Sequence, residues 1–142
     1  MATFKQFSKR IRIIGDGIPE KVNKLVKRVA LVVDQALVTS TPVDTGAARS
    51  NWVVRINEPN QGTIDPYVSG SGGSSGNANA AAALEQGKRV ILPRKNEQEI
   101  HITNNLPYIK RLNNGHSAQA PAGFVQMAVT VGVKTARQGR IL

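Results

Sequence analysis

Cysteine is absent from this chain of 142 residues, and aromatic residues make up only 4% of it. Without cysteine the chain forms no disulfide, no thiol nucleophile and no cysteine-ligated zinc site, which suits assembly in a reducing cytoplasm. Because aromatics are scarce, we expect valine, isoleucine, leucine and alanine to fill the core, with Trp52, Tyr108 and Phe124 as its large side chains. The length fits one domain, residues 1–142, that needs no covalent cross-link.

Long apolar runs are absent as well. No stretch of 18 or more residues is continuously apolar, so we expect a soluble protein without a membrane partner. The first fourteen residues intersperse bases with apolar residues and carry no cleavage site of small residues, so they do not resemble a secretory signal. The bases in question are Lys5, Lys9, Arg10 and Arg12.

Acidic residues are few, and the net charge is +10. Residues 1–28 carry eight bases and two acids, whereas residues 129–142 carry Lys134, Arg137 and Arg140 with no acid. The hundred residues between them have a net charge of only +1. The basic ends are therefore candidate contacts for DNA phosphates or for an acidic partner surface; a solvated helix face with a frayed tail is the alternative.

The N-terminal third has helical periodicity. Phe4, Phe7, Ile11 and Ile14 predict a short amphipathic helix, and we expect the stretch from Gly15 to Pro19 to interrupt it. A helix of five turns is then predicted, because apolar residues recur at the 3.6-residue spacing until Thr41-Pro42 ends it. Its apolar positions are Val22, Leu25, Val26, Val29, Val32, Val33, Ala36 and Leu37.

The rest of the chain predicts a small sheet and short helices. Strands are expected at 51–57 and 99–103, with a further extended piece at 90–92, and helices at 78–88 and 107–112. Residues 58–76 read as a loop whose Gly/Ser-rich part, about 69–77, is a flexible linker. A final helix opens at Pro121 with Phe124, Met127, Ala128 and Val131 on one face, and a basic tail frays from Gly132 or about residue 133.

These elements predict an α+β domain in which a long N-terminal helix packs on a small, mainly antiparallel sheet, with a short C-terminal helix. The turns between them use residues suited to turning the chain. Asp44 is expected to cap the turn before Gly46 and to be near enough to pair with Arg49.

Residues that chemistry usually requires do not form a convincing group. His101 and His116 are the only histidines; Glu97 and Glu99 precede His101 on a strand, where exposed acids usually make a solvated face. Asp44-Thr-Gly46 matches the catalytic triplet of aspartic proteases, but it follows a long helix and a proline instead of an apolar strand. We therefore expect neither a metal or other cofactor nor an enzyme, with a homodimeric protease as a minor alternative.

Four motifs in order resemble the tail-completion or neck proteins of long-tailed bacteriophages, which include the minor tail protein Z type. The resemblance covers about Phe4 to Ala128. The first motif is Thr41-Pro42-Val-Asp44-Thr-Gly46 followed by Ala48 to Trp52, and the second is Asp65 to Tyr67 followed by Ser69 to Gly76. The third is Ile102 to Ile109, which includes Asn104, Asn105, Pro107 and Tyr108. The fourth is Gln119 to Val125, which includes Pro121, Gly123 and Phe124.

The resemblance implies a non-enzymatic virion protein, assembled in the host cytoplasm, that completes the tail and joins it to the head. It implies a ring, with a hexamer matching tail symmetry, beside the tail terminator, the tail tube or the head-completion and adaptor proteins. A mobile Gly/Ser-rich loop and mobile basic ends would order only on assembly. The alternative function is a basic accessory protein that binds DNA without sequence preference, since no base-reading motif is present.

Overall fold

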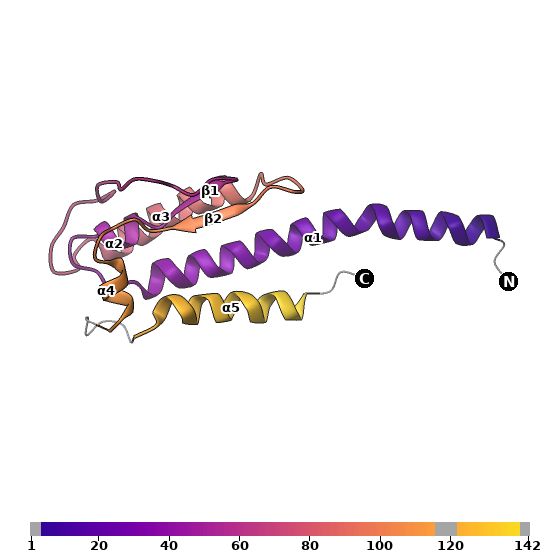
Figure 1. Cartoon of the computed structure of the whole chain (residues 1–142). Coiled ribbons are helices and arrows are strands. Elements are labelled where there is room, and N and C mark those ends of the chain that lie inside the picture. Colours follow the sequence, from indigo (N-terminus) through magenta and orange to yellow (C-terminus); the bar gives the residue numbers. More distant parts are fainter. Residues whose placement is uncertain (1–3, 116–121, 140–142) are drawn as a thin grey trace.

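The computed structural model describes residues 4–115 and 122–139, with side chains described from residue 18 onward. The element order confirms the predicted α+β class: a long N-terminal helix, a small antiparallel sheet and a short C-terminal helix. Three layers are visible in Figure 1: α3 (Gly76–Ile91) with the two strands, then α1 (Phe4–Ser40), then α5 (Phe124–Gln138). The short helices α2 (Ala47–Ser50) and α4 (Ile109–Asn113) lie at the end where α1 finishes.

Helix α1 is continuous, so the predicted interruption between Gly15 and Pro19 is wrong. Pro19 lies inside the helix and has no N–H group to donate to the carbonyl of residue 15. A single proline removes one hydrogen bond of the helix, and the turns on both sides can continue it. The N-terminal turns of α1 extend past the other elements in Figure 1.

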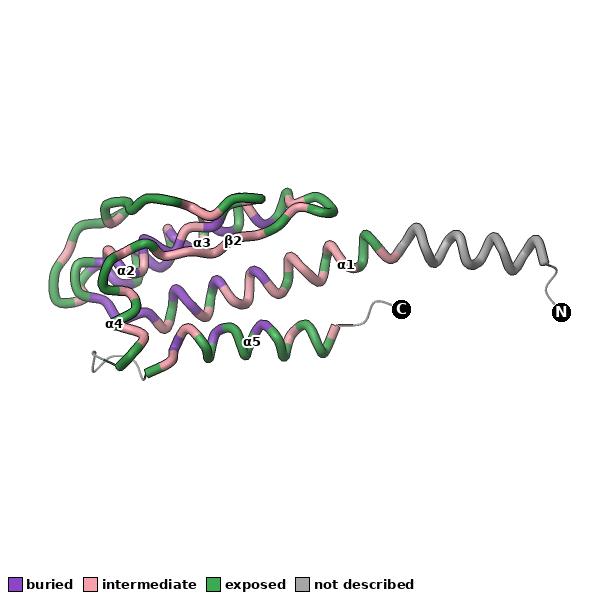
Figure 2. The backbone as a smooth tube through the Cα atoms, in the orientation of Figure 1, coloured by how far each residue is buried: buried purple, intermediate pink, exposed green. Residues whose placement is uncertain are grey.

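Helix α1 is covered on two sides, which explains why its apolar stripe is so wide. The predicted apolar positions from Val22 to Leu37 are all at least partly buried, but of the four most buried positions only Leu37 is among them. Ala30, Asp34, Leu37 and Val38 are 7% exposed or less and face the layer of α3 and the sheet. Figure 2 shows this run of buried residues along the middle of the helix.

Helix α5 packs antiparallel along α1 through Phe124, Ala128 and Gly132, all buried and spaced four residues apart. Met127 and Val131, predicted to share a face with Phe124 and Ala128, lie at the edge of the buried side and are 57% and 44% exposed. The predicted fraying from Gly132 is also wrong, because the helix continues to Gln138. A glycine at 132 lets the two helices approach closely: a Cβ atom there would lie 2.3 Å from Val33 Cγ2.

The sheet has two antiparallel strands, β1 (Val53–Ile56) and β2 (Ile100–Thr103), paired from Val53↔Thr103 to Ile56↔Ile100. Both strands were predicted, each slightly longer. The extended piece expected at 90–92 is wrong, because α3 continues through Ile91, which is fully buried. A short run of β-branched residues has no periodicity that separates a strand from a buried helical turn.

The other boundaries agree with the turn residues. Helix α4 was predicted at 107–112 and ends at Asn113, followed by Gly115 with a positive φ of 91°. The predicted linker ends earlier than expected, because α3 begins at Gly76 and both Ser75 and Gly76 are buried. Pro121 and residues 116–121 lie outside the described residues, as does Arg140.

The close contact between α1 and α5 predicts that Gly132→Ala destabilises the protein. Alanine raises intrinsic helix stability by about 1 kcal/mol, but the added methyl group overlaps Val33, and overpacking typically costs about 1–3 kcal/mol. Urea unfolding measures the net change in the free energy of unfolding. The matched control is Thr130→Ala on the exposed face of α5, which should cause no loss. Equal or greater stability of Gly132→Ala would contradict this packing.

Candidate assembly surfaces

The first motif, Thr41 to Trp52, which we call the first signature stretch, forms a compact turn at the end of α1. The indole N–H of buried Trp52 donates to Thr41 Oγ1 at 2.8 Å, and that hydroxyl donates to the carbonyl of Leu37. The guanidinium of Arg49 donates to the carbonyls of Thr39 and Thr41, which α1 leaves unpaired at its C-terminus. This arrangement satisfies the end of α1 and fixes the direction of the chain into β1; Pro42 is buried within it.

Asn79 is the centre of a buried polar cluster, which consists of Gly46, Ser50, Val68, Ser75 and Asn79. Its side-chain oxygen accepts from Ser50 Oγ at 2.8 Å and from the N–H of Val68 at 2.9 Å. Its amide nitrogen donates to the carbonyls of Val68 and Ser75. Gly46 has a φ of 89°, and a Cβ there would lie 2.1 Å from Asn79 Nδ2. This cluster joins α2, the Gly/Ser-rich segment and α3.

The structure corrects the predicted roles of Asp44. Its carboxylate accepts from the distant N–H of Gly72 at 2.8 Å, and its carbonyl accepts from the N–H of Gly73. Arg49 binds backbone carbonyls, including that of Gly76 at 3.2 Å, instead of pairing with Asp44. The chain turns at Gly46 as expected. Asp44 therefore ties the Gly/Ser-rich segment to the first signature stretch, a contact that sequence spacing does not indicate.

The third motif, Ile102 to Ile109, is hydrogen-bonded to the first signature stretch. Asn104 Nδ2 donates to the carbonyl of Ala48 at 2.9 Å, while Asn105 Nδ2 donates to the carbonyl of Asn60 at 2.6 Å. Pro107 and Tyr108 are exposed just before α4. Gly123, with a φ of 81°, donates to the carbonyl of Asn113 at 2.7 Å and precedes Phe124, which is 1% exposed. Asn104, Asn105 and Gly123 therefore hold chain segments together around one end of the domain, whereas Tyr108, expected in the core, is 42% exposed.

An apolar groove of about 700 Å³ opens between α1, β2 and α5, and we call it the β2 groove. Its floor and walls are mainly aliphatic, and its polar residues come from the loop that leads into β2. The lining residues are Leu25, Val26, Val29, Ala30, Val33, Arg94, Gln98, Glu99, Ile100, His101, Ile102 and Ala136.

The outer edges of β1 and β2, the sides that face away from the other strand, differ in their hydrogen bonding. On β1, the side-chain amide of Gln86 accepts from the N–H of Val54 at 3.0 Å and donates to its carbonyl at 2.8 Å, so α3 closes this edge. Asn57 donates to the carbonyl of Glu99 across the ladder, and such pairs alternate along antiparallel strands. Ile102, the partner of Val54, and Ile100 therefore direct their N–H and C=O groups away from β1. Within the described residues these groups have no further hydrogen-bond partner, and the edge of β2 is open beside the groove.

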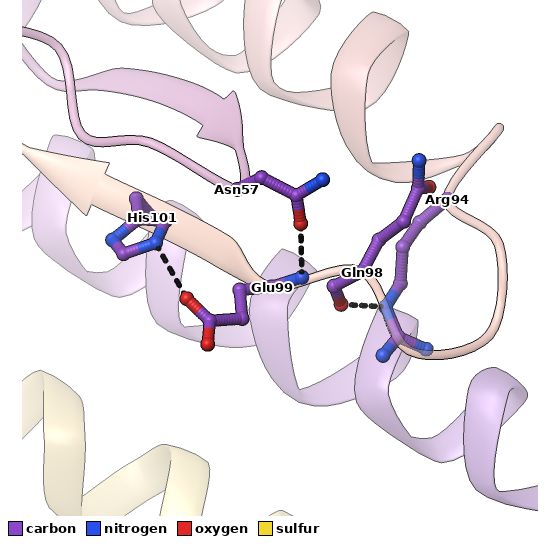
Figure 3. Close-up of polar contacts among 5 residues, drawn as sticks. All are labelled: Asn57, Arg94, Gln98, Glu99 and His101. Carbon is purple, nitrogen blue, oxygen red and sulfur yellow. Dashed lines mark hydrogen bonds and ion pairs between the residues drawn. The ribbon is translucent and has the colours of Figure 1, made fainter.

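Hydrogen bonds connect the polar residues at the end of the groove that is formed by the loop before β2 (Figure 3). Asn57 Oδ1 accepts from the N–H of Glu99 at 3.0 Å, and Arg94 Nε donates to the carbonyl of Gln98 at 2.8 Å. His101 Nε2 lies 3.1 Å from Glu99 Oε2, with 30% of the His101 side chain exposed. His101 was expected on an outward face, but it lines the groove with Ile100 and Ile102. Among the described residues, no group of three or more potential ligands lies close enough to hold a metal ion.

Helix α5 presents a second apolar surface, which we call the α5 stripe. Four large aliphatic side chains beside its buried face are exposed by 44% or more. They are Met127, Val129, Val131 and Val133. By helical spacing, Met127 and Val131 lie on one flank of the buried face, and Val129 and Val133 lie on the other flank. The apolar surface of α5 is therefore wider than the part that α1 covers.

The described basic residues concentrate near the far end of α5. Lys21, Lys24 and Arg28 share one face of α1 and, with Gln138 and Gly139, line a hollow of about 230 Å³. Lys24 pairs with Glu20 at 3.6 Å on the surface. Lys134 and Arg137 are exposed on α5. The side chains of Lys5, Lys9, Arg10 and Arg12 lie outside the described side chains, although the backbone of these residues belongs to α1.

Asp34 is the most unusual polar residue of the core. It is 1% exposed, its Oδ1 has no hydrogen-bond partner, and it borders a cavity of about 300 Å³ shared with Leu31, Gln35, Leu84 and Lys88. Burial raises the pKa of this carboxyl to about 7. Gly87 makes room for it, since a Cβ there would lie 2.2 Å from Asp34 Oδ2.

Three residues with structural importance were not found from the sequence. An acid inside an apolar stripe was a signal for Asp34, and an amide directly before an alanine run was one for Asn79. Gln86 gave no signal, because its role depends on where β1 lies in space. None of the described helices combines the length and the apolar character that crossing a bilayer requires.

The raised pKa of Asp34 predicts a stability that falls as pH rises. The folded chain holds a proton that the unfolded chain releases between pH 3.8 and about 7, so the contribution is complete below that window and lost through it. At one pKa unit per 1.4 kcal/mol, wild type should lose up to about 4 kcal/mol relative to Asp34→Asn across the window. Denaturant unfolding at several pH values measures this loss, with Asp65→Asn as the exposed control. Parallel profiles of wild type and Asp34→Asn would contradict it.

Comparison of the chain with protein-family models, with curated proteins and with solved structures found no match in any of the three. The likeness to phage tail-completion proteins therefore depends on the four sequence motifs alone.

Proposed function

We propose that this chain is a structural protein of the neck of a long-tailed bacteriophage virion. It forms a ring, with six subunits matching the symmetry of the tail, that completes the tail and joins it to the head. Its neighbours are the tail terminator, the tail tube or the head-completion and adaptor proteins, and it is assembled in the host cytoplasm without acting as an enzyme.

The α5 stripe carries this proposal. A helix that is already packed on α1 and still exposes Met127, Val129, Val131 and Val133 has a surface suited to a neighbouring subunit. The β2 groove is a second surface of a different shape, and its α5 residue, Ala136, lies by helical spacing on the flank of α5 opposite to Met127 and Val131. Two unlike surfaces on one chain are what a head-to-tail interface in a closed ring requires.

The turn motifs support the same reading in another way. Their side chains fix the end of α1, α2 and the segments beside them against one another, mostly through hydrogen bonds to backbone atoms. A rigid end of this kind holds the exposed surfaces at a constant angle, as subunits of a closed ring need. The motifs therefore support a scaffold role.

A double substitution in the α5 stripe tests the proposal. Met127→Gln with Val131→Gln should leave the thermal midpoint nearly unchanged, because both side chains are exposed, but should weaken subunit packing. Supplied to a phage that lacks the gene, this variant should restore infectious titre at least tenfold less well than wild type. The matched control is Leu92→Gln, an equally exposed aliphatic residue outside α5. Full restoration by the double variant would contradict the role of the stripe.

A second candidate, non-specific DNA binding, is favoured by the cluster of Lys21, Lys24 and Arg28. If these residues neutralise phosphates, the logarithm of the binding constant should fall with the logarithm of salt concentration, by about 0.9 per phosphate contact. Titration of fluorescent duplex DNA at several salt concentrations measures this slope. Lys21→Gln with Arg28→Gln should lower the slope by up to about two. A weak or absent salt dependence would remove this candidate.

A further inference from the structure

The β2 groove has three properties that together define what can bind there. Its surface is aliphatic, one wall is a strand edge with open N–H and C=O groups, and bases border it. An open strand edge beside apolar walls accepts an extended segment as an added strand. The segment must therefore be extended, carry apolar side chains, and suit a basic border.

The charge at the border comes from two helical turns of α1 and from the loop before β2. Arg94 lines the groove itself. Lys21, Lys24 and Arg28 line the hollow next to it, and Leu25 belongs to both. Two acids belong to this border: Glu99 lies against His101, and Glu20 pairs with Lys24. The balance is positive, so an acidic segment is favoured.

This chain itself contains a segment of that chemistry. Residues 57–68, which we call the acidic loop, carry Glu58 and Asp65 without any base, and no lysine or arginine occurs between Arg55 and Lys88. The loop exposes Ile64, Tyr67 and Val68 by 38%, 41% and 44%. It therefore combines acidic charge with apolar side chains in a chain that is otherwise strongly basic.

The backbone of the acidic loop also has an open edge. Asn51 holds Ile64 from one side, accepting from its N–H and donating to its carbonyl, both at 2.8 Å. In an extended segment successive residues direct their backbone groups to opposite sides. Thr63 and Asp65 therefore direct theirs away from Asn51, where the described residues supply no partner.

The loop and the groove lie on different sides of the sheet. In Figure 1 the loop returns from β1 along the side away from α1, whereas the groove lies between β2, α1 and α5. The sheet separates them within one chain, so contact between them joins two copies.

We propose that the β2 groove binds the acidic loop of a second copy of this chain, whose residues 63–65 add as a strand to the open edge of β2. Ile64 enters the aliphatic groove, and Asp65 and Glu58 face the basic border. Because each copy has one loop and one groove, the contact is head-to-tail and repeats around a ring. This inference depends on the proposed ring.

Chemical cross-linking tests the contact directly, because the natural chain has no cysteine. The variant Thr63→Cys/His101→Cys, treated with a short bismaleimide, should give a ladder of linked chains in particles assembled from it. The single variants should give dimers at most. The control Asn77→Cys/His101→Cys, which moves one thiol to an exposed position on α3, should give no ladder.

Charge reversal provides an independent readout. Glu58→Lys with Asp65→Lys should lower the infectious titre at least tenfold, and adding Lys21→Glu with Arg28→Glu to the same chain should restore it. Restoration supports pairing of these two surfaces, because a merely misfolded loop would not be rescued from α1. If the fourfold variant stays defective while both double variants keep the thermal midpoint of wild type, the pairing is overturned.

The outcomes separate this inference from the proposed function. If the chain is present in joined particles but gives no ladder, or links His101→Cys to a different protein, the loop is not the occupant of the groove and the neck function stands. If the chain is absent from joined particles, the proposed function fails, and this inference fails with it.

Discussion

The fold depends most on the hydrogen bonds of Asn79, which is fully buried in α3. This one side chain binds Ser50 in α2, Val68 in the long loop and Ser75 at the start of α3. A buried amide with its partners removed costs about 1–3 kcal/mol per unsatisfied group, so these contacts specify one arrangement. Position 46 requires glycine for two reasons: its φ is positive, and Asn79 occupies the space that a Cβ atom would need.

Buried hydrogen bonds of this kind also explain how the Gly/Ser-rich segment, which has few apolar side chains, holds one conformation. Asn79, Asp44 and Arg49 each bind backbone groups of the Gly/Ser-rich segment or of its junction with α3. The backbone of a loop without apolar side chains is held by polar contacts instead of by a core. The aliphatic core itself lies elsewhere, along α1, where Leu37 and Val38 meet Trp52, Ala83 and Phe124.

Much of the fold could be predicted from local sequence. The 3.6-residue spacing from Val22 to Leu37 indicated α1, and the alternation around Ile100 and Ile102 indicated β2, because each pattern reflects one buried face. The break at Pro19 was wrong because one missing N–H group does not end a helix whose neighbouring turns are intact. The exposure of Met127 and Val131 was not predictable, because periodicity finds an apolar face without telling how much of it a partner within the same chain covers.

The candidate site was less predictable than the fold. The turn residues from Pro42 to Trp52 were recognised as a unit, but their partners, such as Asn79 and Gly72, are set by tertiary contacts. The β2 groove depends on three elements far apart in the chain, and its open edge exists because Gln86 closes the other strand edge. Sequence patterns describe elements one at a time, whereas an assembly surface depends on how the elements are placed together.

The neck role is the central claim, and electron microscopy of particles made without this chain tests it most directly. If the gene is silenced in the parent phage, the account predicts DNA-filled heads and separate, full-length tails. Normally joined particles would contradict it.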